Sequence, residues 1–116
     1  MAVTIYGITT CDTVRKARAF LDAGGIAHRF HDFRVDGLDA GTLDRWIDAL
    51  GWETLLNRSS TSFRALPEER KIVDDARDAA ALMLAEPTMI KRPVLDADGR
   101  LTVGFKPDPW RGMLGL

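Results

Sequence analysis

Two apolar runs with strand character flank one amphipathic run near the start of the chain, and this order limits the fold more than any other feature. Residues 2–6 (AVTIY) predict a buried strand, and residues 27–33 (AHRFHDF) predict a second one. Between them, apolar residues at three- and four-residue spacing predict a helix over residues 12–23. These apolar residues are Val14, Ala17, Phe20 and Leu21. A strand, a helix and a strand in this order indicate two parallel strands joined by a right-handed crossover.

The middle of the chain predicts helices. We expect one helix from Asp39 to Gly51 and a shorter one over residues 52–57. Residues 58–66 have no apolar periodicity and are expected to form a loop. Pro67 fits the first position of a further helix, because proline has no N–H group to leave unpaired there. The residues expected on the buried side of that helix are Ile72, Ala76, Ala79 and Met83.

The end of the chain predicts a hairpin and a last helix. Residues 92–105 contain two short apolar arms around the turn sequence DADG, which indicates two antiparallel strands. Asp108 is expected to cap the last helix, with Pro109 at its first position. The whole order is β-α-β, a helical stretch, then β-β-α. A four-stranded mixed sheet with flanking helices satisfies it, so the predicted fold class is α/β.

The size and charge of the chain favour some classes of protein over others. Its 116 residues suit a single domain, 1–116, with a hydrophobic core of its own. Sixteen Lys and Arg residues against seventeen Asp and Glu leave a formal net charge of −1, so we expect no nucleic-acid or membrane partner. The first residues lack the pattern of a signal peptide, and the longest apolar stretch, residues 79–85, is too short for a bilayer. We expect a cytoplasmic protein, and a monomer.

Cys11 is the only cysteine, and it stands where the first predicted strand gives way to the first predicted helix. A lone cysteine cannot form an internal disulfide, which favours a reducing compartment. Free N–H groups and aligned peptide dipoles at a helix start favour a thiolate over a thiol. Inert burial is the alternative for any single cysteine. The position at a helix start, with Arg15, Lys16 and Arg18 nearby, favours a reactive role.

The spacing around Cys11 limits its chemistry. Val14 stands three residues further on, so the chain has no Cys-x-x-Cys pair. Any redox cycle must take its second thiol from outside, and glutathione is the natural donor in the cytosol. The alternative is a sulfur that binds or is modified without turnover. We expect no metal site, because His28 and His31 would point to opposite faces of an extended strand and would need more ligands.

Four stretches of the chain together resemble a known family. They are YGITTCDTVRKARAFL, HDFRVDGLD, LLNRSSTSFR and IKRPVL, in this order. The set is similar to the arsenate reductase (ArsC)-like family of thioredoxin-fold proteins, and in particular to its YffB/Spx-related branch. The resemblance covers nearly the whole chain. It implies a thioredoxin-like fold with a helical insertion, at residues 37–90 or close to them, between the second and third strands.

The resemblance also implies a set of site residues. Cys11 matches the family's nucleophile, which in glutaredoxin-linked arsenate reductases attacks arsenate and then forms a mixed disulfide with glutathione. Arg58 and Arg92 match two of the three arginines that surround the anion, and the third falls at or near Lys106. Pro93 is implied to be the cis proline that faces the active cysteine in thioredoxin folds. The candidate residues for binding glutathione or substrate are Thr10, Asp12, Thr13, Arg58, Arg92, Pro93 and Lys106.

The resemblance and the single cysteine favour a glutathione-dependent thiol reductase, an oxidoreductase with glutathione as co-substrate and no bound cofactor. Its substrate is expected to be a disulfide or a small oxyanion, with glutaredoxin as a further partner. Lys106 keeps a positive charge but lacks the planar two-point grip of arginine, so arsenate fits less well as the substrate. Three alternatives stay open: an arsenate reductase, an Spx-like protein that binds RNA polymerase, and a thioredoxin fold without catalysis.

Overall fold

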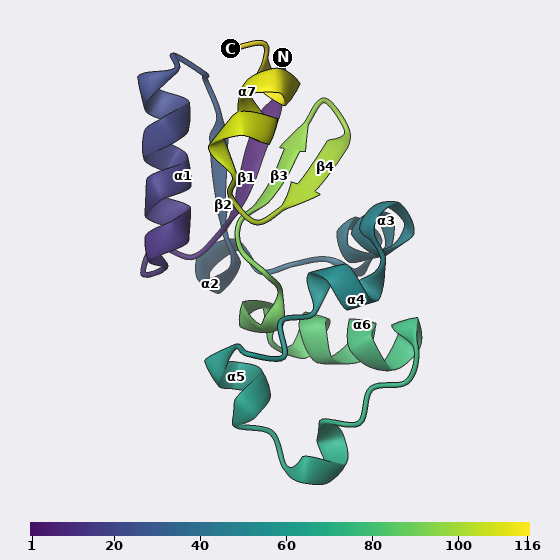
Figure 1. Cartoon of the computed structure of the whole chain (residues 1–116). Helices are drawn as coiled ribbons and strands as arrows, with labels where there is room; N and C mark the ends of the chain where they lie inside the picture. The colour runs from purple at the N-terminus through teal and green to yellow at the C-terminus, as the bar shows by residue number, and fades with distance from the viewer. The chain divides into compact units, whose positions relative to one another are not determined.

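The computed structural model describes every residue of the chain, and its contacts divide into two compact units (Figure 1). The first unit consists of Met1–Asp36 and Arg92–Leu116, and the second consists of Gly37–Lys91. The first unit contains the four-stranded sheet, whereas the second is built mainly from helices. No helix in either unit combines the length and the apolar character that crossing a membrane requires.

The sheet of the first unit has the mixed topology that the sequence predicts. Its strands are β1 (Val3–Gly7), β2 (Arg29–Asp32), β3 (Val94–Ala97) and β4 (Arg100–Val103). They lie in the order β2-β1-β3-β4. β1 and β2 are parallel, whereas β3 runs antiparallel to both β1 and β4. The expected parallel pair and the expected hairpin are therefore confirmed, and the molecule has the α/β, thioredoxin-like fold.

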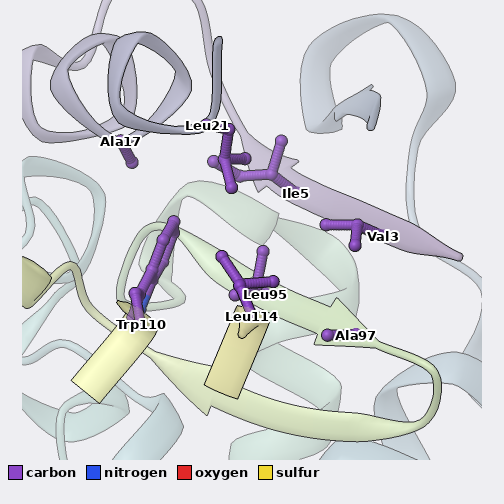
Figure 2. Close-up of a cluster of buried hydrophobic side chains, with 8 residues drawn as sticks. All are labelled: Val3, Ile5, Ala17, Leu21, Leu95, Ala97, Trp110 and Leu114. Atoms are coloured by element: carbon purple, nitrogen blue, oxygen red, sulfur yellow. The ribbon is translucent and has the colours of Figure 1, made fainter. Parts of the chain in front are cut away.

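The core of the first unit packs two helices against the sheet. These helices are α1 (Asp12–Ala23) and α7 (Pro107–Leu114). The buried cluster consists of Val3, Ile5, Ala17, Leu21, Leu95, Ala97, Trp110 and Leu114 (Figure 2). Each fully buried side chain of leucine size contributes about 1.5–3 kcal/mol relative to an exposed one. This apolar packing holds α1 against β1 and β3, and so fixes where α1 begins.

Gly7 ends β1 at a place where a larger residue would not fit. A Cβ atom there would lie 2.6 Å from Cγ2 of Val14, a completely buried residue in the first turn of α1. The absence of a side chain therefore lets α1 approach the end of β1. The segment from Ile8 to Cys11 follows directly and connects the strand to the helix.

The second unit consists of four short α-helices and two single 3₁₀ turns (Figure 1). The α-helices are α3 (Ala40–Leu50), α4 (Trp52–Leu55), α5 (Thr61–Arg64) and α6 (Ala76–Ala85). The carboxylate of Asp39 accepts a hydrogen bond of 2.8 Å from the Thr42 N–H, which confirms the predicted start of α3. Ala79 and Met83 are buried, as expected for α6.

Two expectations for the second unit were wrong. The segment expected as a loop over residues 58–66 contains α5, because the Ser60 hydroxyl accepts a 3.1 Å hydrogen bond from the Phe63 N–H and caps a helix too short to show periodicity. The helix expected from Pro67 is only a 3₁₀ turn, Glu68–Arg70. Ile72 lies beyond that turn and is 68% exposed, so it does not line the core.

Two boundaries in the first unit also differ from the prediction. Phe33 does not extend the second strand but begins α2 (Phe33–Asp36), a single helical turn. The last helix begins at Pro107 with Lys106 as its N-cap residue, so Asp108 is not the cap. Proline fits the first position of a helix, and the side chain of Asp108 pairs with Arg111 at 2.5 Å instead.

Candidate functional site

Cys11 is the N-cap residue of α1, and its thiol is free and half-buried. Its carbonyl oxygen accepts a 3.0 Å hydrogen bond from the Arg15 N–H, which starts the helix. No side chain caps α1, in contrast to the caps that Asp39, Ser60 and Asp75 supply to α3, α5 and α6. The first N–H groups of α1 therefore have no side-chain acceptor, and such groups can bind an anion.

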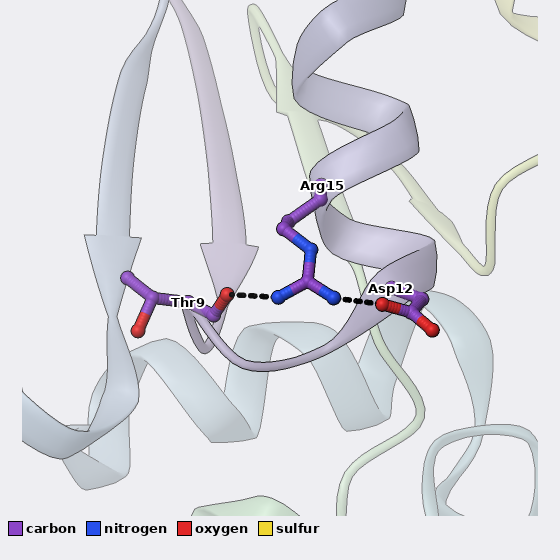
Figure 3. Close-up of polar contacts among 3 residues, drawn as sticks. All are labelled: Thr9, Asp12 and Arg15. Carbon is purple, nitrogen blue, oxygen red and sulfur yellow. Dashed lines mark hydrogen bonds and ion pairs between the residues drawn. The ribbon is translucent and has the colours of Figure 1, made fainter.

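The loop before α1 is cross-linked by one arginine (Figure 3). Arg15 donates a hydrogen bond of 3.4 Å to the carbonyl oxygen of Thr9 and forms an ion pair with the carboxylate of Asp12. Both charged side chains are more than half exposed, so the pair contributes only about 0–1 kcal/mol. The carboxylate of Asp12 balances the positive charge of Arg15. Arg15 therefore adds no net positive charge next to Cys11.

The pairing of β1 with β3 places Arg92 at the same end of the sheet as Cys11. Tyr6 pairs with Val94 in this antiparallel register. The chain that leaves β1 toward Cys11 and the chain that enters β3 from Arg92 and Pro93 therefore meet at one end. The Arg92–Pro93 peptide bond is cis, as the resemblance implied, and Pro93 is completely buried. Arg92 itself is half-buried.

The pairing of β3 with β4 brings Lys106 to this end as well. Val94 pairs with Val103, so the residues after β4 leave the sheet where β3 begins. The Gly104 N–H donates a 2.8 Å hydrogen bond to the carbonyl oxygen of Pro93, which holds the two segments together. Lys106 follows as the exposed N-cap residue of α7, and it forms no ion pair.

A residue that the sequence analysis missed also lies at this end. Gly7 pairs with Asp32 in the parallel register, so the chain after β2 arrives beside the chain after β1. There Arg34, in α2, donates a 3.1 Å hydrogen bond from Nη1 to the hydroxyl oxygen of Thr10. The signal that could have identified Arg34 is the predicted parallel pair, because both strands of such a pair end on the same side of the sheet.

The first unit thus gathers most of the predicted site residues at one end of its sheet. They are Thr10, Cys11, Asp12, Thr13, Arg92, Pro93 and Lys106. Thr13 is exposed in the first turn of α1. Arg58 is not among them, because it belongs to the second unit, where its guanidinium carbon lies 5.7 Å from the centre of the Phe63 ring.

Comparison with known proteins agrees with this architecture. The model of the ArsC family matches residues 6–113. The structure of the YFFB (PA3664) protein has 49% sequence identity and a TM-score of 0.91, over 95% of this chain and 96% of that one. The structure of an arsenate reductase (ArsC) related protein from Brucella melitensis has 53% identity and a TM-score of 0.77, over 100% of this chain and 97% of that one.

A more distant likeness extends to a regulator. The global transcriptional regulator Spx of Streptococcus mutans is 25% identical over 116 residues, which cover 97% of this chain and 82% of that protein. The family match includes the helix start with Cys11, the segment with Arg92 and Pro93, and most of α7. The chain therefore belongs to the ArsC family.

Proposed function

We propose that this protein is a glutathione-dependent thiol reductase in which Cys11 is the only redox-active residue. The observation that carries the proposal is the place of Cys11, as the half-buried N-cap residue of a helix that no side chain caps. A thiolate at such a position is stabilised by the helix dipole and by the free N–H groups. Arg92 and Lys106, which share this end of the sheet, supply positive charge for an anionic substrate.

The proposed cycle uses one protein sulfur and two molecules of glutathione. The Cys11 thiolate attacks the glutathione sulfur of a mixed disulfide between glutathione and a substrate thiol. A bond forms between Cys11 and glutathione, and the substrate leaves as its thiolate, which takes a proton from water. A second glutathione thiolate then attacks the glutathione sulfur bound to Cys11, so that glutathione disulfide leaves and the Cys11 thiolate is restored. Two electrons pass from glutathione to the substrate disulfide.

The absence of a second cysteine favours this monothiol cycle over a dithiol one. Val14 occupies the position where a Cys-x-x-Cys protein would have its resolving thiol. The mixed disulfide with glutathione therefore has no internal competitor, and it should accumulate whenever the second glutathione is withheld.

The test is a steady-state assay with glutathione, hydroxyethyl disulfide, glutathione reductase and NADPH. Glutathione and hydroxyethyl disulfide form the mixed disulfide in solution, and NADPH consumption reports the glutathione disulfide produced. We expect turnover above the uncatalysed rate for the natural chain and none for Cys11→Ser, which changes one atom. Mass spectrometry should find one glutathione attached to the natural chain and none to the variant. Equal NADPH consumption by both proteins would refute the proposal.

Arsenate reduction is a second candidate, because the B. melitensis structure is described as arsenate reductase related. By resemblance, this chain has Lys106 where an arginine would complete the anion site, and lysine binds an oxyanion as a point charge. In an assay with arsenate, glutathione and glutaredoxin, we expect little activity from the natural chain and a gain from Lys106→Arg. Arsenate turnover faster than disulfide turnover in the natural chain would favour this second function.

Binding to RNA polymerase is a third candidate, which the likeness to Spx suggests. This function would not need a reactive thiol, so Cys11→Ser should leave it unchanged. Immobilised RNA polymerase core enzyme provides a direct binding assay. Saturable binding together with no glutathione-linked turnover would favour the regulator over the reductase.

A further inference from the structure

We propose that Arg34 binds a carboxylate of the glutathione attached to Cys11, so that α2 contributes a carboxylate subsite to the reductase. This inference rests on the proposed function, because it names what that site recognises. Arg34 was not among the residues that the sequence or the family resemblance indicated. One contact connects Arg34 to the candidate site, the hydrogen bond from its guanidinium to the hydroxyl of Thr10.

The distance between Arg34 and Cys11 suits a tripeptide. The Arg34 Nη1 atom lies 3.1 Å from Oγ1 of Thr10, and Thr10 is the chain neighbour of Cys11. The guanidinium is therefore at most about 12 Å from the Cys11 sulfur, given the standard dimensions of the chain. An extended tripeptide spans about 10 Å, and the sulfur of glutathione lies on its middle residue. The disulfide bond to Cys11 adds about 2 Å and a hydrogen bond to the carboxylate adds about 2.9 Å, so a carboxylate of glutathione bonded to Cys11 can reach the guanidinium.

The charge of Arg34 is available for a ligand. Arg34 forms no ion pair, and its one side-chain hydrogen bond goes to a neutral hydroxyl. A guanidinium has five N–H donors in a planar fork that matches a carboxylate, so most of these donors remain for another acceptor. Arg15 differs, because its guanidinium already pairs with Asp12. Of these two arginines, Arg34 is the one that a new carboxylate can bind without displacing another.

The backbone around Arg34 is held in place by nearby carboxylates. Asp32 accepts a 2.9 Å hydrogen bond from the Arg34 N–H, and Asp36 accepts one of 3.1 Å from the Asp32 N–H. These carboxylates therefore organise the turn rather than neutralise the guanidinium. Thr10 then orients the Arg34 side chain toward the segment that contains Cys11. The subsite is thus partly organised before the ligand arrives, which reduces the entropy that binding costs.

The experiment compares two disulfides that differ in charge. Each disulfide, either glutathione disulfide or neutral hydroxyethyl disulfide, is mixed in excess with the reduced protein. Stopped-flow kinetics then gives the rate constant for formation of the mixed disulfide on Cys11. In both reactions Cys11 bonds to one sulfur of the reagent, and the other half leaves as a thiolate. We expect Arg34→Gln to lower the rate constant for glutathione disulfide by about 10-fold, and to leave that for the neutral disulfide within about 2-fold.

Two further variants make the test specific. Arg29→Gln removes the same charge from an exposed residue at the opposite end of β2, and it should change neither rate constant. Thr10→Val removes the hydroxyl that orients Arg34 but keeps the shape of the side chain. It should lower the rate constant for glutathione disulfide by about 3-fold, which is less than the loss of the charge itself.

The outcomes separate this subsite from the proposed function. A selective loss with glutathione disulfide in Arg34→Gln supports the subsite. Equal rate constants for the natural chain and Arg34→Gln, while the natural chain still turns over, would overturn the subsite and leave the reductase standing. A natural chain whose Cys11 reacts with neither disulfide would overturn both.

Discussion

Replacing Gly7 with alanine should destabilise the protein, because the added methyl group meets α1. The new Cβ would lie 2.6 Å from Cγ2 and 3.1 Å from Cγ1 of Val14. Val14 is completely buried, so its side chain cannot turn away into solvent. Overpacking of a well-packed core costs about 1–3 kcal/mol. The clash involves the last residue of β1 and the first turn of α1. These two elements hold the ends of the segment that contains Cys11.

A double-mutant cycle tests whether Val14 is the residue that alanine at position 7 would meet. Val14→Ala alone removes two buried methyl groups, which should cost about 1.6 kcal/mol before any cavity forms. In the double variant the methyl group of alanine has the vacated space, and the nearest remaining atom, Cβ of residue 14, is 3.5 Å away. The double variant should therefore be about 1–2 kcal/mol more stable than the sum of the single changes predicts.

The measurement is the free energy of unfolding from urea denaturation, followed by circular dichroism and by tryptophan fluorescence. Gly112→Ala is the matched control, because Gly112 lies inside α7 and a Cβ there meets no atom within 4 Å. It should stabilise the protein by about 0.5–1 kcal/mol, the usual gain of alanine over glycine in a helix. Additivity of the Gly7→Ala and Val14→Ala effects within about 0.5 kcal/mol would refute the argument.

Three further predictions concern the core and the helix caps. Leu95→Ala empties a completely buried position in the cluster of Figure 2 and should lower the free energy of unfolding by about 2–5 kcal/mol; a loss under about 1 kcal/mol would contradict that packing. Ser60→Ala removes the acceptor for the Phe63 N–H and should cost about 1 kcal/mol in urea denaturation, whereas Ser60→Thr keeps a hydroxyl and should cost less. Hydrogen bonds from the N–H and then the hydroxyl of Thr42 lower the pKa of Asp39 below its ordinary value of 3.8. A lowered pKa makes the carboxylate stabilise the fold above pH 3.8, and this stabilisation is lost as the pH falls through the lowered pKa. The variant Asp39→Asn retains a capping oxygen but does not titrate. Between roughly pH 5 and pH 2, its free energy of unfolding should therefore change less with pH than that of the natural chain.

The parts of the fold that the sequence predicted well are those with a strong repeated pattern. The alternation of two apolar strands with one amphipathic helix indicated the parallel pair of β1 and β2, and the DADG turn indicated the hairpin of β3 and β4. The helix expected over residues 12–23 has the same bounds as α1, Asp12–Ala23. Long periodic segments constrain the backbone at many positions at once, so a single misleading residue changes little.

The errors lie where one local contact decides the structure. A single hydroxyl, that of Ser60, starts α5, and a four-residue helix is too short to show periodicity. The run after Pro67 has apolar residues at helical spacing, but Asp75 accepts a 2.8 Å hydrogen bond from the Asp78 N–H and begins α6 there. The polar residues before it therefore stay outside the helix. The signal for this boundary was present as an aspartate in an N-cap position, and the apolar spacing concealed it.

The candidate site was predictable in part because topology follows from strand order. Once β1, β3 and β4 are placed in one mixed sheet, the segments that contain Cys11, Arg92 and Lys106 must reach the same end. Arg34 was missed for a different reason. Its contact with Thr10 joins residues 24 positions apart, and no local pattern in the sequence reports such a pair. Only the combination of the parallel register with the side-chain hydrogen bond identifies it.

The net charge of −1 does not describe the environment of Cys11. Exposed charges farther apart than about 8–10 Å are largely screened at physiological ionic strength, so the charges around a bound ligand, rather than the net charge of the chain, determine which ligand the site attracts. At the end of the sheet that contains Cys11, the carboxylate of Asp12 is already paired with Arg15, whereas the side chains of Arg34 and Lys106 form no ion pair. Cations without an ion-pair partner at this end of the sheet would favour an anionic reaction partner over a neutral one, as the proposed reaction with negatively charged glutathione requires. A chain that is nearly neutral as a whole can therefore still present positive charge at one end of its sheet.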